Sequence, residues 1–141
     1  MKQLVVFTIT IMTLVGCNRP TEDYIPFING YWEIKEATLP NGVKKVYSFS
    51  DTIDYIHIGD SLTGFRKKLK PNLTGSFEAS NDSETLLLKI ENDSLNLYYS
   101  TDFATWKETV LSATKDELLI LNTNNVRYLY KRYEPLSITH D

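Results

Sequence analysis

The sequence contains very little cysteine and histidine, and this scarcity excludes several kinds of function. Its only cysteine is Cys17, so no disulfide within the chain is available to stabilise a fold. Its two histidines are His57 and His140, and neither belongs to a group with metal-ligand spacing. We therefore expect no bound metal and no cofactor.

The sequence also lacks the patterns that accompany catalysis. It has no nucleophile-elbow motif, no phosphate-cradling glycine loop and no zinc cluster. Glu108 could act as an acid or base in a dry cavity, because burial would raise its pKa, but no second carboxylate is paired with it by spacing. We expect that the protein is not an enzyme. The formal net charge of -3 gives no reason to expect binding to nucleic acid.

The apolar stretch that follows Lys2 is too short to cross a bilayer comfortably, since a spanning helix needs about 20 apolar residues. A positively charged start, an apolar run and a small residue at a cut point are typical of a secretion signal. The division expected from this pattern is a signal peptide over residues 1–17, a linker over 18–26, one domain over 27–135 and a tail over 136–141. A chain of this length can build one hydrophobic core and not two.

The end of the signal, Leu14-Val15-Gly16-Cys17, resembles the lipobox of bacterial lipoproteins. This resemblance implies that Cys17 becomes the diacylated first residue of the mature protein, and two acyl chains hold a domain stably at a membrane. Asn18, rather than Asp, follows the cysteine, which by the bacterial sorting rule implies the outer membrane. We expect a lipid-anchored protein of the cell envelope, on either the periplasmic or the surface face.

The rest of the chain alternates apolar and polar residues in short segments separated by turn residues, a pattern that favours an antiparallel sheet. Strands are predicted over residues 30–36, 43–49, 53–58, 63–69, 73–79, 85–90, 95–100, 105–111, 118–122 and 126–133. Asn81-Asp82, Asn92-Asp93 and Asn124-Asn125 are among the turn signals between them. No segment has a sustained helical period. We expect an all-β fold, an up-and-down antiparallel meander of about 8–10 strands that closes into a barrel and so removes its edges.

Two segments resemble known lipocalin signatures. Gly30-Tyr31-Trp32 resembles the Gly-x-Trp motif of the first strand, and Tyr128-Leu129-Tyr130-Lys131-Arg132 resembles the closing strand with its arginine. The mature chain is similar to the short lipocalin-like lipoproteins of Bacteroidota. The resemblance implies that Trp32 packs beneath Arg132 as a barrel-closing pair at one end of the barrel.

Alternation along the strands predicts which side chains face inward. Trp32 and Ile34 share one face, Leu86, Leu88 and Ile90 another, and the candidate cavity lining is Tyr99, Trp106, Glu108, Tyr128 and Tyr130. Apolar walls with a few polar groups suit a small hydrophobic ligand. The alternative is a filled barrel with a self-satisfied Glu108–Arg132 pair. Such a protein would be a non-enzymatic accessory or scaffold subunit with an envelope protein partner.

Two surface features leave alternatives open. In the basic cluster from Arg66 to Lys70, only Lys67 is expected to point inward, and the exposed cations either guard against edge pairing or meet lipid head groups or an acidic glycan. The triplets that contain Thr52, Ser61 and Ser94 resemble the O-glycosylation sequon of exported Bacteroidota proteins. Each triplet is equally an ordinary turn followed by an apolar strand residue.

Overall fold

The computed structural model describes residues 19–134, which form one short 3-10 helix and nine β-strands. The elements are η1 (Thr21–Phe27), β1 (Gly30–Thr38), β2 (Lys44–Val46), β3 (Ile53–Ile58), β4 (Thr63–Pro71), β5 (Phe77–Glu91), β6 (Ser94–Ser100), β7 (Thr105–Ala113), β8 (Glu117–Asn122) and β9 (Arg127–Arg132). Cys17 and the expected lipidation lie outside the described residues.

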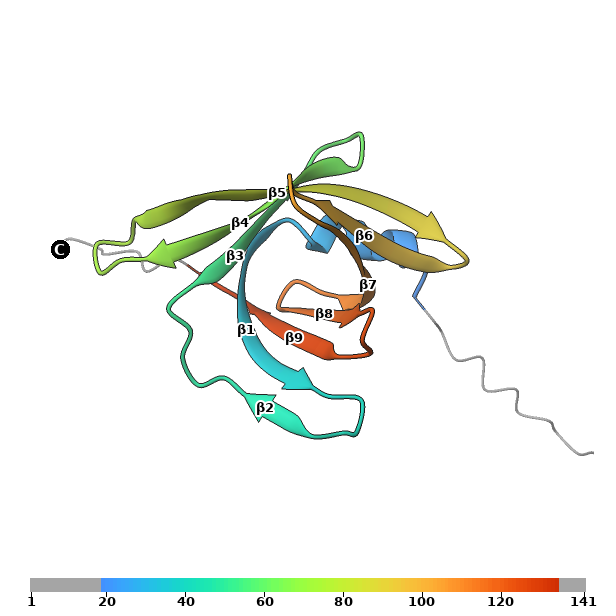
Figure 1. The fold of residues 1–141 in the computed structure, drawn as a ribbon, viewed down its shortest axis with the longest axis horizontal. Helices are drawn as coiled ribbons and strands as arrows, with labels where there is room; N and C mark the ends of the chain where they lie inside the picture. Colours follow the sequence, from blue (N-terminus) through green and yellow to red (C-terminus); the bar gives the residue numbers. More distant parts are fainter. Residues whose placement is uncertain (1–18, 135–141) are drawn as a thin grey trace, which may run out of the picture.

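Eight strands form a closed antiparallel barrel. The order is β1-β3-β4-β5-β6-β7-β8-β9, each strand pairs with its neighbour, and β9 returns to pair with β1 (Figure 1). The predicted all-β meander closed into a barrel is therefore confirmed. Within residues 19–134, no helix is long and apolar enough to span a membrane.

One edge of β1 is shared by two strands. Its first residues, Gly30 to Trp32, pair with β3, whereas Glu36 to Thr38 pair with β2. A bulge in β1 at Lys35, seen in its pairing with β9, separates the two halves. β2 is thus an additional strand beside the ring, in the hairpin at the bottom of Figure 1.

The main difference from the expected strands lies in β5. Residues 73–79 and 85–90 were predicted as separate strands, but one long strand runs from Phe77 to Glu91 and Asn81-Asp82 makes no hairpin turn. Along β4 and β5, Lys67 faces Ser83 while Leu69 faces Ala79, so β5 has extra residues at this point. A bulge absorbs them, and their exposed polar side chains remain in solvent.

One end of the barrel is closed by η1 and the residue after it. η1, assigned largely to a linker by the sequence, packs against β6 and β7 (Figure 1). Ile28 is fully buried, and Tyr24, Ile25 and Phe27 pack against the same core. The core fills this closed end because the inward positions of β5, β6 and β8 are leucine and isoleucine. Ile90, expected inward, is 39% exposed, because η1 covers β6 and β7 at this end while Ile90 stands on β5.

Candidate functional site

Trp32 and Arg132 meet at the closed end of the barrel. The guanidinium carbon of Arg132 lies 3.8 Å from the centre of the Trp32 ring, and Trp32 Nε1 donates to the Ile28 carbonyl oxygen at 2.8 Å. Arg132 also donates to the carbonyl oxygens of Phe27, Asn29 and Lys115 at 2.6–2.9 Å. The contact therefore ties η1, β9 and the β7–β8 connection together, which is a structural role.

A second group of polar side chains lies inside the barrel, between the apolar core and the open end. Its members come from six strands and all face inward, because each pairs across the sheet with another inward residue. We call the following residues the polar layer: Asp54, Arg66, Glu84, Tyr99, Glu108 and Tyr130.

Arg66 is the centre of the polar layer. Its side chain is 12% exposed, its Nε donates a hydrogen bond to Glu84 Oε2, and its guanidinium carbon lies 4.3 Å from the centre of the Tyr99 ring. Its Nη1 is 3.7 Å from Glu108 Oε2, which is an ion pair without a hydrogen bond. The barrel therefore encloses a cation between an aromatic ring and two carboxylates.

The inward position of Arg66 corrects the expected facing of the basic cluster. Arg66 was expected outside and Lys67 inside, but Arg66 pairs with Ile56, which belongs to the barrel core, so both face inward. Leu69 is buried opposite Ile53 of β3, which is also buried. Lys68 is 55% exposed, with its Nζ 2.5 Å from Asp54 Oδ1.

The Glu108–Arg132 pair, which belonged to the alternative of a filled barrel, does not form. Arg132 lies at the end of β9 beside Trp32, whereas Glu108 pairs across the sheet with Leu97 and Asn122, further toward the open end. Arg66 supplies the positive charge near Glu108 instead. Burial raises the pKa of Glu108, and Arg66 opposes this shift.

Three polar atoms of the layer are buried without a hydrogen-bond partner among the described residues: Asp54 Oδ1, Tyr99 Oη and Glu108 Oε2. Asp54 Oδ1 forms an ion pair with Lys68 Nζ at 2.5 Å, which leaves Tyr99 Oη and Glu108 Oε2. Tyr99 is only 1% exposed. Burial raises the pKa of Tyr99, Arg66 opposes the shift and Glu108 adds to it. Buried polar groups are usually satisfied, so both atoms need an explanation.

The remaining candidate lining residues stand around the polar layer. The rings of Trp106 and Tyr99 stack with centroids 5.3 Å apart and planes 12° apart. Burial raises the pKa of Tyr130, and the negative charges of Asp54 and Glu108 add to the shift. Tyr128 is half-buried beside Ala37, one inward position closer to the open end of β9. The structure thus brings Tyr99, Trp106, Glu108 and Tyr130 together, with Tyr128 above them.

Inside the barrel, a narrow gap lies below the polar layer. Its volume is about 180 Å³, and no part of it admits a water-sized sphere. It is lined by Trp32, Asp54, Ile56, Arg66, Leu118, Ile120 and Tyr130. Side chains therefore fill most of the barrel, and the gap separates the apolar core from the charges.

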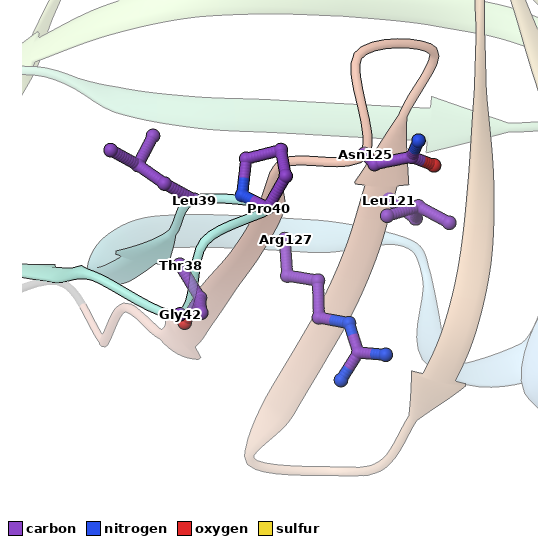
Figure 2. Close-up of a pocket in the computed structure, with 7 residues that line it drawn as sticks. All are labelled: Thr38, Leu39, Pro40, Gly42, Leu121, Asn125 and Arg127. Atoms are coloured by element: carbon purple, nitrogen blue, oxygen red, sulfur yellow. The ribbon is translucent and has the colours of Figure 1, made fainter.

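An open depression of about 500 Å³ lies outside the barrel, between the β1–β2 and β8–β9 turns (Figure 2). Thr38, Leu39 and Pro40 line one side, and the Arg127 side chain extends away from them along β9. None of the candidate lining residues contributes to it. This depression is separate from the polar layer.

Other expected sites are placed as follows. Ser61 is exposed in the β3–β4 turn with its Oγ 2.7 Å from Thr63 Oγ1, while Thr52 and Ser94 are half-buried. Glycosylation of the three remains a prediction. In the part of the chain that the structure describes, no three His, Cys, Asp or Glu side chains are arranged to hold a metal ion.

Sequence reasoning identified Glu108, Tyr99 and Tyr130 but missed Arg66, Asp54 and Glu84. A signal for the missed residues is present in the strand pattern. Asp54 is in phase with Ile56, and Glu84 is in phase with Leu86, so each charge occupies an inward position of its strand. A charged residue that lies two positions from a buried apolar residue on the same strand points to the same side of the sheet. Such residues therefore indicate a polar group inside the barrel.

A closed up-and-down antiparallel barrel with a mixed apolar and polar interior defines a lipocalin-like protein. A family model described as a lipocalin-like domain matches residues 28–120, and the chain belongs to this family. A similar solved structure is that of an uncharacterized protein from Bacteroides eggerthii DSM 20697. It has 15% sequence identity and a TM-score of 0.48, and the match covers 74% of this chain and 98% of that chain. No curated protein matches the sequence.

Proposed function

We propose that the barrel binds a small, largely hydrophobic ligand in its open half, above the apolar core, and that the protein carries this ligand rather than transforming it. The observation that supports this most directly is the pair of buried, unpartnered atoms Tyr99 Oη and Glu108 Oε2 among the described residues. Membership of the lipocalin-like family agrees with ligand binding as a general role.

The cost of the polar layer supports this proposal. Burying charges is expensive, and well-packed apolar residues of similar volume are often as stable or more so. A barrel that served only as a rigid body would gain nothing from Arg66 and Glu108 in its interior. A ligand that forms the missing hydrogen bonds would offset the cost of burying these residues.

Entry of a ligand needs side-chain movement, because the gap under the polar layer is too narrow for water. Glu84 is 25% exposed and Lys68 is 55% exposed, so both side chains reach solvent and can change rotamer. Trp106 and Tyr128, which are half-buried, would then form the apolar walls around the ligand.

We further propose that a lipid on Cys17 holds the barrel at the outer membrane. Two or more acyl chains would anchor a domain of this size stably. Replacing Cys17→Ser and fractionating the host cells tests the anchor: the variant should leave the membrane fraction, and a variant that stays there contradicts it.

Native mass spectrometry of the protein purified from its own host tests ligand binding. We expect a co-purifying small molecule with the unaltered interior, and its loss in Glu108→Leu. The matched control is Glu117→Leu, which removes an exposed carboxylate at the opposite end of the barrel and should retain the molecule. A mass equal to the protein alone, under conditions that preserve a known lipocalin complex, contradicts the proposal.

A second candidate is an accessory subunit of an envelope complex that works through its outer surface. The filled interior favours it, as do the exposed side chains of Phe49 and Phe103, which are 80% and 98% exposed. An empty barrel that captures one membrane protein in the host, with capture lost in Phe49→Ser, would support this candidate over the first.

A further inference from the structure

We propose that the ligand carries a protonated amine, which binds Glu108 beside Tyr99 in the polar layer. This inference rests on the proposed ligand-binding function and specifies its chemical class. It is carried by the balance of charges inside the barrel, by the unpartnered atoms Tyr99 Oη and Glu108 Oε2 and by the aromatic rings next to them.

Acidic groups outnumber basic groups at the polar layer. Among the described residues that face it, three are carboxylates, namely Asp54, Glu84 and Glu108, and two are cations, namely Arg66 and Lys68. Lys68 lies 2.5 Å from Asp54, and Arg66 donates its hydrogen bond to Glu84. Glu108 is the carboxylate left over, with Arg66 Nη1 no closer than 3.7 Å.

The unpartnered atoms can both accept a hydrogen bond. Glu108 Oε2 accepts when ionised, and Tyr99 Oη accepts as well as donates. An ammonium group has three N–H donors and no acceptor, so one head group could satisfy both atoms. A carboxylate head group would instead add a fourth negative charge next to Glu108, which disfavours fatty acids.

The aromatic side chains would also attract the ammonium group of the ligand. Arg66 already lies 4.3 Å over the Tyr99 ring, so this ring is placed to hold a positive charge in the interior. Trp106 stacks on Tyr99 at 5.3 Å and extends the aromatic surface toward the open end. An alkyl chain attached to the amine would lie along these rings.

The test compares three probes of equal chain length, decylamine, decanol and decanoate, kept below the concentrations at which they form micelles. Binding to the full-length chain carrying Cys17→Ser, which removes the acylation site, is measured by isothermal titration calorimetry. We expect decylamine to bind about tenfold more tightly than decanol, and decanoate to bind most weakly.

The variant Glu108→Gln keeps the shape of the side chain and removes its charge. It should abolish the preference for decylamine while leaving decanol binding within about twofold. The control Glu117→Gln removes an exposed carboxylate that pairs with Lys35 at the other end and should retain the preference.

The outcomes separate this inference from the proposed function. Equal binding of decanol and decylamine, or tighter binding of decanoate, overturns the amine while ligand binding stands. A preference that persists in Glu108→Gln also overturns it. Failure of all three probes to bind argues against the proposed function itself.

Discussion

Glu108 is a residue whose surroundings oppose its charged form. Burial is the largest effect on its pKa, and it raises the pKa above the usual 4.5, although Arg66 pulls in the other direction. The folded protein therefore holds a proton on this carboxyl more readily than the unfolded chain does. Its contribution to the free energy of unfolding must decline as the pH rises from 4.5 through the folded-state pKa.

Glu108→Gln removes this ionisation at nearly constant shape. We expect the variant to be more stable than the unaltered protein at neutral pH, with a difference that shrinks as the pH falls toward 4.5. Urea unfolding midpoints across this range measure the difference. Glu117→Gln, a solvent-exposed control, should show no comparable pH-dependent gain. A difference for Glu108→Gln that grows toward acid pH would contradict the argument.

At the scale of elements, alternation predicts strands well where one face is apolar and the turn chemistry is clear. β6 and the Asn92-Asp93 turn before it were predictable, because Leu95, Leu97 and Tyr99 alternate and both turn residues tolerate positive φ. β5 was not predictable as one strand, because a bulge interrupts its alternation and the residues at the bulge are polar and exposed.

The interior charges were harder to predict than the strands. Asp54, Arg66 and Glu84 keep the inward phase, but a charged residue is assigned to solvent unless its partners across the sheet are known. Those partners depend on register, which local sequence does not specify at a bulge. The helical turn η1 was also missed, because its stability comes from packing on β6 and β7 rather than from a helical period.

The β5–β6 turn offers a direct test of backbone strain. Asn92 and Asp93 have φ values of 49° and 62°, which glycine adopts more easily than aspartate does. We expect Asp93→Gly to raise the free energy of unfolding by about 0.5 kcal/mol, measured by urea unfolding. Asp102→Gly, in a turn residue without positive φ, should lower it. Destabilisation by Asp93→Gly would show that its side chain matters more than its backbone.

For the whole molecule, one side chain at the closed end of the barrel contacts distant parts of the chain. Arg132 joins Phe27 and Asn29 near the start of the domain to Lys115 and its own strand at the end. Charged donors to backbone carbonyls are stronger than neutral ones, and the ring of Trp32 lies directly beneath the charge.

We expect Arg132→Met to lower the free energy of unfolding by about 3 kcal/mol. The measurement is chemical denaturation followed by circular dichroism. Arg127→Met, which changes an exposed arginine in the same strand, should have an effect below about 0.5 kcal/mol. Similar losses in the two variants would mean that strand β9, and not the closed-end contact, is the sensitive feature.

Under the proposed lipid anchor, the position of η1 would determine which way the barrel points. Thr21 Oγ1 donates to the Asp93 carbonyl oxygen at 3.2 Å, so the beginning of η1 is fastened to the closed end. A lipid on Cys17 would be four residues from that point, a reach of about 14 Å at most. The closed end would then stand against the head groups and the mouth would open to the aqueous side. A ligand would be exchanged with a partner in that compartment, rather than drawn directly from the bilayer below.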